Sequence, residues 1–309
     1  HLYLWQMLAA TNLLLLLPLL LLHSHTATTA SVWPIPKQEI YHHDLPTLYI
    51  APTTTFVPTL RSTILSSSIA RYSTILTTLA ALRPPTTPPP PAHTLHHITV
   101  QVSNADPELS ATTSFRYNLT VLSPHHAILS ADTVHGAAHA LETFVQIFHN
   151  GSSKPAIVHD APSFPWRGLM LDVGRRFAPV PMVQNLLDTM SFLKLSVLHF
   201  HASDYCRWSI ESVHYPQLTS KLQPGMADAG YYTQQDIRTI VAYAKERGIR
   251  VVPEFDLPGH AYQWAKVLED TGTGLTLCKG SDYTIYNDPS NNASLRVLTT
   301  VRLRVVGRV

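Results

Sequence analysis

The chain has 309 residues, of which 45% are hydrophobic and 14% charged, and its formal net charge is +2. This length holds one large domain or two ordinary ones, and the apolar content excludes wholesale disorder. The near-neutral charge argues against the basic face of a nucleic-acid-binding protein, and two cysteines are too few for a disulfide scaffold or a cysteine-based structural zinc site.

Residues 1–30 are predicted to be a secretory signal peptide. An apolar run that is nearly all leucine extends from Leu13 to Leu22 and is interrupted by Pro18. It is shorter than the roughly 20 apolar residues that cross a bilayer. The small residues from Thr26 to Ser31 suit a signal-peptidase site. A buried helix is the alternative interpretation of the run.

Three N-glycosylation sequons agree with a secreted or lysosomal/vacuolar location: they begin at Asn118, Asn150 and Asn292. Such tripeptides also occur by chance, so they carry weight only together with the leader. In that compartment Cys278 is available for a disulfide bond, and its partner stays open between Cys206 and a cysteine outside the 309 residues.

Residues 31–165 indicate a small α/β domain. A helix is expected over residues 62–82 and a strand over 97–102. The proline-rich stretch 83–92 lies between them, and because neither a helix nor a central strand tolerates it, we expect an exposed polyproline-like loop.

Two further elements close this domain. Apolar residues alternate with polar ones from Phe115 to Val121, which predicts a half-buried strand. Helical spacing follows from Val134 to Phe148, with Asp132 or Thr133 as the N-cap. The histidines of the region are predicted to lie at strand ends and in loops, solvated and without a role: His93, His96, His97, His125, His126, His135 and His139.

Residues 166–309 change to a strand–helix–strand rhythm. Strands are expected at 167–172, 196–201 and 249–255, the first of them a buried-type strand. A helix begins just after Pro181, and another is opened by the cap Thr233-Gln-Gln-Asp236 and ends at Gly248. Alternating strands and helices predict a parallel α/β sheet, either open or closed into a barrel.

In a parallel barrel the chemistry lies in the loops that follow the strands. Three such loops carry ionisable groups: residues 172–176, 199–208 and 254–260. Arg175 offers a rigid fork of donors for hydroxyls or carboxylates, and Trp208 offers an apolar face of the kind that packs on sugar rings.

Each candidate has a structural alternative. Arg175 is also suited to a surface ion pair, Asp204 to a turn or helix cap, and His260 to a helix start without a role. His199 and His201 present the His-x-His pattern of a zinc-dependent hydrolase, with His260 as the one further ligand available.

Three segments of this half resemble the β-N-acetylhexosaminidases of glycoside hydrolase family 20. They are Arg-Gly-Leu-Met-Leu-Asp-Val-Gly-Arg-Arg-Phe at 167–177, Lys-Leu-Ser-Val-Leu-His-Phe-His-Ala-Ser-Asp at 194–204, and Arg-Gly-Ile-Arg-Val-Val-Pro-Glu-Phe-Asp-Leu-Pro-Gly-His at 247–260. Residues 131–144 also resemble the last helix of that family's N-terminal accessory domain. The resemblance covers most of residues 95–270.

The resemblance implies a zincin-like α/β accessory domain at 31–165 followed by a (β/α)8 TIM barrel that is incomplete at 166–309. Members remove terminal N-acetylglucosamine or N-acetylgalactosamine from glycans or chitin oligomers, without a metal or other cofactor, and commonly form dimers. Catalysis is retaining and substrate-assisted: the acetamido oxygen of the substrate attacks C1, an Asp orients the acetamido group, and a Glu protonates the leaving oxygen.

The same resemblance assigns roles by position. Arg175 matches the Arg that grips hydroxyls of the terminal sugar, while Asp204 and His260 match residues that support the catalytic Glu. His199 and His201 then become framework residues.

The chain departs from the family pattern in two places. Tyr205 and Cys206 stand where a second acidic residue is common, and no Asp-Glu dipeptide occurs anywhere in the sequence. We therefore expect the N-terminal part of a secreted β-N-acetylhexosaminidase that is inactive by itself. A non-catalytic carbohydrate-binding short form and a metal-dependent hydrolase that uses His199, His201 and His260 are the alternatives.

Overall fold

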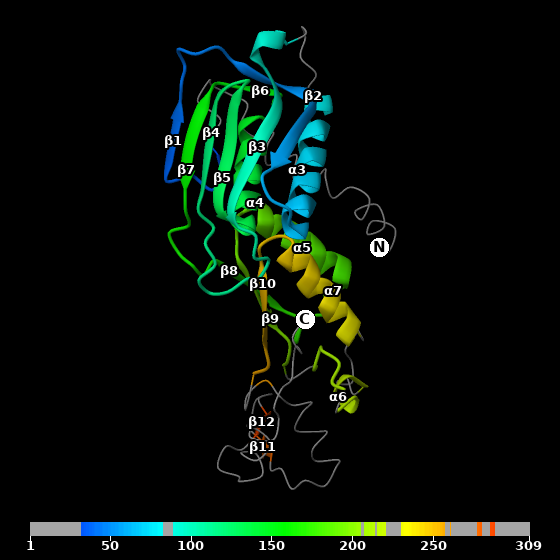
Figure 1. Ribbon diagram of the computed structural model, residues 1–309. Coiled ribbons are helices and arrows are strands. Elements are labelled where there is room, and N and C mark those ends of the chain that lie inside the picture. The colour runs from blue at the N-terminus through cyan, green and yellow to red at the C-terminus, as the bar shows by residue number, and fades with distance from the viewer. Residues whose placement is uncertain are drawn as a thin grey trace, which may run out of the picture. The chain divides into compact units, whose positions relative to one another are not determined.

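The computed structural model describes residues 32–82, 89–204, 207–213, 215–220, 230–256, 260, 277–279 and 285–287. The chain divides into two compact units, one of residues 1–105 with 115–161 and the other of residues 106–114 with 162–309 (Figure 1). Within the described ranges, no helix is long and apolar enough to cross a membrane. The predicted signal peptide and Asn292 lie outside the described residues.

The first unit is built on a seven-stranded mixed sheet with the strand order β1-β7-β4-β5-β3-β2-β6. Strand β2 pairs in parallel with β3, and β3 with β5, while the remaining pairs are antiparallel. The strands are β1 (Gln38–Tyr41), β2 (Leu48–Pro58), β3 (Thr94–Asn104), β4 (Tyr117–Ser123), β5 (His126–Thr133), β6 (Ser152–Ser153) and β7 (Ala156–Asp160).

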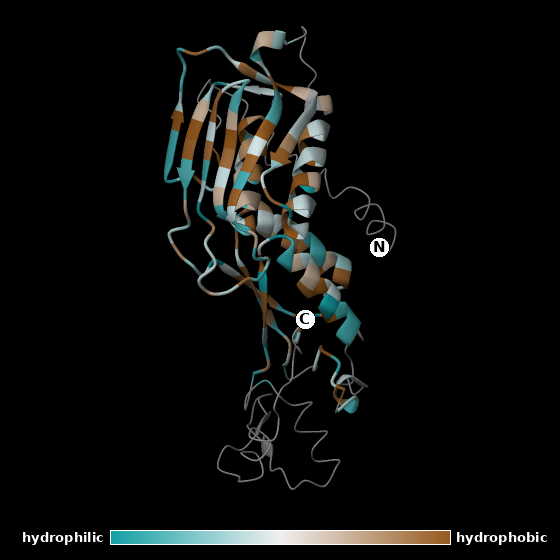
Figure 2. Cartoon of the chain, in the orientation of Figure 1, coloured by the Kyte–Doolittle hydropathy of each residue, from teal (hydrophilic) through white to brown (hydrophobic). Residues whose placement is uncertain are grey.

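Two helices, α3 (Thr63–Leu82) and α4 (Val134–Ile147), pack on one face of this sheet (Figure 1). Buried Tyr117, Leu119 and Val121 of β4 alternate with half-buried residues, as the sequence predicts, and join the helices in one core. Figure 2 shows the strands banded in brown and paler colours because successive side chains point to opposite faces. The ring of Phe56 meets Phe144 of α4 edge to face.

The start of α4 resolves the choice between two predicted caps. Thr133 is the N-cap, and its side-chain oxygen accepts a hydrogen bond from the backbone N–H of Gly136 at 3.1 Å. Phe115, which the sequence placed in the preceding strand, is buried but lies outside β4, since that strand begins at Tyr117.

The prediction for the histidines of this region is wrong for His135 and His139. Both lie on α4 and are buried, because α4 packs against α3 as well as the sheet and is covered nearly all round. The His139 ring stacks on Phe115, with ring centroids 4.9 Å apart. Residues 83–88 of the proline-rich loop lie outside the described residues, and its last two residues form the start of a short 3-10 turn, η1 (Pro91–His93).

The second unit contains a parallel sheet of the order β10-β9-β8. It is formed by β8 (Gly168–Asp172), β9 (Val197–His201) and β10 (Arg250–Glu254), with α5 (Val180–Phe192), α6 (Gln217–Ser220) and α7 (Gln234–Lys245) in the connections. Strands β11 (Leu277–Lys279) and β12 (Ile285–Asn287) form a separate antiparallel pair. The described strand–helix–strand order confirms the predicted mixed α/β class with parallel strands.

Local signals position the helices of this unit. Thr233 and Asp236 form a reciprocal capping box at the start of α7, and Gly248, with φ 71°, follows its end. Helix α5 starts at Val180 and takes Pro181 into its first turn, so it begins slightly earlier than predicted.

The buried character predicted for the first strand of this sheet is wrong. Leu169 and Met170 of β8 are 39% and 56% exposed. Because successive side chains point to opposite faces of a sheet, the described part of the chain covers neither face of β8 well at these two positions.

Candidate functional site

Three loops converge at the carboxyl end of the parallel sheet. Asp172 of β8 is level with His201 of β9, which is level with Glu254 of β10. Because parallel strands end at the same edge, the residues that follow them lie side by side. The structure thus brings together the three segments that the sequence singled out.

The first two loops approach each other closely at Gly174. The backbone N–H groups of Val173 and Gly174 both donate to the carbonyl of His201, at 3.0 and 3.1 Å. A Cβ atom on Gly174 would lie 2.7 Å from the backbone carbonyl carbon of Ser203. Only glycine allows this approach, which holds the loop carrying Arg175 against the loop carrying Asp204.

Arg175 is fixed by two carboxylates. Its Nε lies 2.7 Å from Oδ2 of Asp204 and 3.2 Å from Oδ2 of Asp172, and its backbone N–H donates to Oδ1 of Asp172 at 3.0 Å. Asp204 is buried, whereas the Arg175 side chain is 62% exposed. Arg175 therefore forms the ion pair that the sequence offered as an alternative, and its side chain is at the same time exposed to solvent as a donor group.

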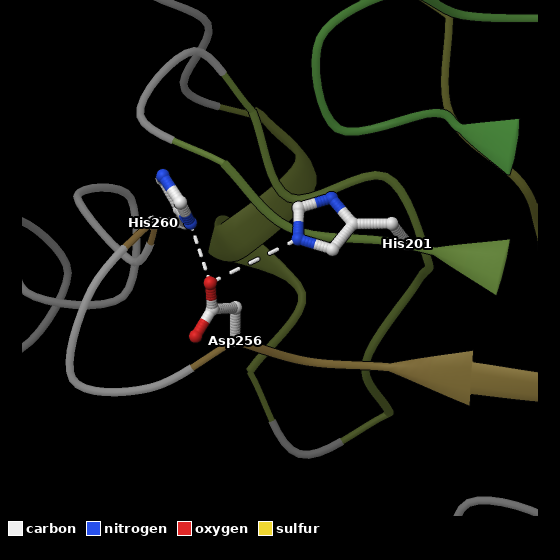
Figure 3. Close-up of side chains that lie close together, drawn as sticks. All are labelled: His201, Asp256 and His260. Carbon is white, nitrogen blue, oxygen red and sulfur yellow. Dashed lines mark hydrogen bonds and ion pairs between the residues drawn. The ribbon is translucent and has the colours of Figure 1, made fainter. Parts of the chain in front are cut away.

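The third loop supplies an aspartate–histidine pair. Nδ1 of His260 lies 2.5 Å from Oδ2 of Asp256, and Nε2 of His201 lies 4.0 Å from the same oxygen (Figure 3). His260 has a positive φ of 48°, which lies outside the right-handed helical region. The backbone N–H of Asp256 donates to Oγ of buried Ser203 at 2.9 Å, which ties the third loop to the second.

His201 links the two halves of the site. Its Nδ1 lies 3.2 Å from Oδ1 of Asp172, the aspartate that also holds Arg175. The network therefore runs from Arg175 through Asp172 to His201, and the other ring nitrogen of His201 faces the Asp256–His260 pair. Asp172 and Asp256 are the members to which sequence reasoning gave no role. The Asp-x-x-x-His spacing at 256–260 was the one available signal for Asp256.

The zinc ligands proposed from sequence, His199, His201 and His260, are not gathered together. His199 is engaged elsewhere, with its Nε2 2.5 Å from Oε2 of Glu254 on the neighbouring strand. The described groups whose atoms are close enough to share a cation are His201, Asp256 and His260, and Asp172, His201 and Asp204. His199 belongs to neither group.

Trp208 lies beneath the loops, with little of its indole at the surface. It is 5% exposed and stacks on Phe255, with ring centroids 4.8 Å apart. Its predicted contact with sugar stays a prediction.

Burial raises the pKa of the Tyr232 hydroxyl, which donates a hydrogen bond to the carbonyl of Ala178. The positive charge of buried Arg207 lowers the same pKa, but burial has the larger effect.

The two described sequons occupy different settings. Asn150 is exposed in the turn after α4. Asn118 is half-buried within β4, and its Oδ1 lies 2.7 Å from Nδ1 of His159 on β7.

The first unit also has a polar cavity of about 250 Å³ on β3, β4 and β5. Its lining includes Arg116 and Asp132, whose charged atoms are 3.9 Å apart and largely exposed.

Sequence comparison places both halves of the chain in one enzyme group. Residues 164–306 match the profile described as "Glycosyl hydrolase family 20, catalytic domain", and residues 32–147 match "beta-acetyl hexosaminidase like". The beta-hexosaminidase subunit beta of Felis catus is 33% identical over 86% of this chain and 51% of its own length. Beta-hexosaminidase 3 of Arabidopsis thaliana is 37% identical over 56% of this chain and 34% of its own length.

Solved structures agree with these sequence matches. The chitobiase of Flavobacterium johnsoniae has a TM-score of 0.69 and 25% identity, covering 89% of this chain and 42% of its own. The exo β-N-acetylglucosaminidase of Vibrio harveyi, solved with N-acetylglucosamine, has a TM-score of 0.66 over 89% of this chain and 44% of its own. At 23% identity it supports the fold alone. The chain spans about half of the length of the feline relative and less of the others.

Proposed function

Because this chain belongs to glycoside hydrolase family 20, we propose that the whole protein hydrolyses terminal β-linked N-acetylhexosamine residues and that this chain carries the sugar-gripping side of its active site. The observation that carries the proposal is the Arg175–Asp204 pair at the carboxyl end of the parallel strands. Substrates of the proposed enzyme are glycans or chitin oligomers that end in N-acetylglucosamine or N-acetylgalactosamine.

Arg175 is the proposed sugar-binding residue. Asp204 and Asp172 hold its Nε and backbone, so the guanidinium is pre-oriented before a ligand arrives. The side chain is 62% exposed, which leaves guanidinium surface for the hydroxyls of a terminal sugar. A donor held in place loses less conformational freedom on binding than a flexible one.

His260 is the proposed support of the catalytic acid, and Asp256 extends that support. The Asp256 carboxylate accepts a hydrogen bond from His260 Nδ1, which leaves Nε2 of the same ring for a further partner. A histidine fixed in this way can orient a carboxylic acid and exchange a proton with it. Asp204, placed next to Arg175, supports this side of the site through the guanidinium.

The reaction follows from the family as a retaining, substrate-assisted hydrolysis. The acetamido oxygen of the substrate attacks C1, and the acid protonates the departing oxygen. Since no Asp-Glu dipeptide occurs in the sequence, we expect the 309-residue chain to bind the sugar without hydrolysing a chromogenic N-acetylglucosaminide.

The predicted organisation belongs to the same proposal. It comprises a leader at 1–30, a zincin-like accessory domain at 31–165 and part of a TIM barrel from 166 onward. The seven-stranded sheet with two helices on one face and the parallel β8–β10 unit support this arrangement. The leader-like run and three sequons support passage through the secretory pathway, and dimer formation follows from the family alone.

The experiment compares two neighbouring arginines. Saturation-transfer NMR of the 309-residue chain with N-acetylglucosamine should give signals that Arg175→Ala abolishes. Arg176→Ala, which removes the same charge from the next exposed position, should leave them intact. Equal signals from the two variants would remove Arg175 from the site, and turnover of the chromogenic substrate by the 309 residues would contradict our account of the missing acid.

A further inference from the structure

We propose that His201, Asp256 and His260 form an exchangeable binding site for Zn²⁺, separate from any requirement of the hydrolytic reaction. One carboxylate oxygen and two imidazoles form this cluster, and all three ligand atoms lie within 4.8 Å of one another. Figure 3 shows the two rings directed at the same oxygen of Asp256. Imidazole and carboxylate together suit Zn²⁺, whereas Mg²⁺ prefers oxygen ligands alone.

The orientation of the His201 ring favours a cation at its Nε2. Its Nδ1 faces Oδ1 of Asp172 at 3.2 Å, and because a carboxylate only accepts hydrogen bonds, this geometry assigns the proton of the neutral ring to Nδ1. The lone pair of Nε2 then faces Oδ2 of Asp256 at 4.0 Å. Two electron-rich atoms that face each other favour a cation between them. A carboxylate behind a histidine is also the usual outer support of a metal-binding imidazole.

The distances between the ligand atoms are close to those of a zinc site. Two ligands of tetrahedral zinc lie roughly 3.3 Å apart when the bonds to the metal are about 2.0–2.1 Å. The His201–Asp256 distance of 4.0 Å is longer than this, and the His260–Asp256 distance of 2.5 Å is shorter. Side-chain movements of less than about 1 Å would therefore admit the ion, which would replace the proton shared by His260 and Asp256.

The three ligand residues are accessible to an ion from solvent and are partly held in place. The side chains of Asp256 and His260 are 33% and 40% exposed, so an ion can enter from solvent, whereas that of His201 is 9% exposed. Ser203 holds the backbone of Asp256 at 2.9 Å.

The neighbouring group Asp172, His201 and Asp204 is a poorer site. The Arg175 guanidinium already lies against both of its carboxylates and supplies the positive charge there. Zinc is therefore assigned to the side of His201 that faces Asp256. A bound ion would take His260 and Asp256 away from the proposed acid and inhibit the whole enzyme.

The test is calorimetric titration of the 309-residue chain with Zn²⁺ in the presence of a weak chelator, which masks isolated surface histidines. We expect one tight equivalent in the unmodified chain and in His199→Gln, the control at the other histidine of the strand. His201→Gln and His260→Gln should weaken this equivalent by more than a hundredfold. Asp172→Asn, which alters the outer support of His201 and one of the two carboxylates that hold Arg175, should weaken it by about tenfold.

Two further measurements keep the result decisive. Asp256→Asn preserves side-chain shape and should also lose the site, and far-UV circular dichroism identifies any variant that is unfolded. Co²⁺ should give a visible ligand-field band that is absent from Asp256→Asn. Equal Zn²⁺ affinity in all variants, or an equal loss in His199→Gln, would overturn the proposal. Because the readout is metal binding, failure here would leave the sugar-binding proposal untouched.

Discussion

The approach of the first two loops at Gly174 gives the most quantitative prediction. Replacing Gly174 by Ala places a Cβ atom 2.7 Å from the Ser203 carbonyl carbon and 2.9 Å from both the Asp204 nitrogen and the Ser203 oxygen. All three are backbone atoms, so none can rotate away. To restore the ordinary contact distance of 3.4 Å, one loop must retreat by about 0.7 Å.

That retreat has a cost that can be worked out from the contacts. Overpacking of this kind costs about 1–3 kcal/mol. The hydrogen bonds from Val173 and Gly174 to the His201 carbonyl, now 3.0 and 3.1 Å, would stretch beyond useful length. They contribute about 1 kcal/mol each. We expect Gly174→Ala to lower the free energy of unfolding of the second unit by about 3–5 kcal/mol.

Gly168, at the start of β8, provides the matched control. A Cβ atom there would also meet an atom at 2.7 Å, but that atom is Nε1 of Trp166, a side chain that is 54% exposed and can move aside. Gly168→Ala should change the stability by less than about 1 kcal/mol.

Urea denaturation followed by tryptophan fluorescence measures the difference, since buried Trp208 reports on the loops. With a slope of about 2 kcal/mol/M, the Gly174→Ala midpoint should fall by about 1.5–2.5 M. An unchanged midpoint for Gly174→Ala, or an equal fall for Gly168→Ala, would refute the close approach of the loops.

Three other outcomes follow from the structure. Burial raises the pKa of Tyr117 above its ordinary value of 10, so the unfolded phenol ionises first and stability should fall above pH 10, by up to about 1.4 kcal/mol per pH unit, in alkaline denaturation. Tyr117→Phe should reduce that slope, and an unchanged slope would contradict the assignment. Thr233→Ala should cost about 1 kcal/mol in urea melts by removing the capping box, whereas Thr239→Ala, exposed on the same helix, should cost little. Asn150 should carry a glycan after secretion, seen as a mass loss on enzymatic deglycosylation that Asn150→Gln eliminates; an unmodified Asn150 would argue against the secretory route.

Much of the fold could be predicted because local signals and packing agree. The alternation at 117–121 marks β4, and the Thr233–Asp236 pair marks the start of α7. Strand β2 gives no such signal, since its Thr-Thr-Thr run and two prolines lack an alternating pattern, and its place depends on β3. The burial of His135 likewise depends on elements that pack around α4 from elsewhere in the chain.

The position of the site could be predicted from the sequence, but the contacts among its residues could not. The rule that loops after parallel strands carry the chemistry selected Arg175, Asp204 and His260. It could not pair Arg175 with Asp204, because that contact depends on the register of β8 and β9. The link through Asp172 depends on the same register, and sequence alone does not give it.

The central claim is that the carboxyl ends of β8, β9 and β10 bind a terminal N-acetylhexosamine. The most direct test is a map of backbone amide chemical shifts in the 309-residue chain as N-acetylglucosamine is added. Our account predicts saturable shifts at Arg175, Asp204 and Asp256, and none around the cavity of the first unit at Gln101 and Arg116. Shifts confined to that cavity, or none at the strand ends at saturating sugar, would contradict it.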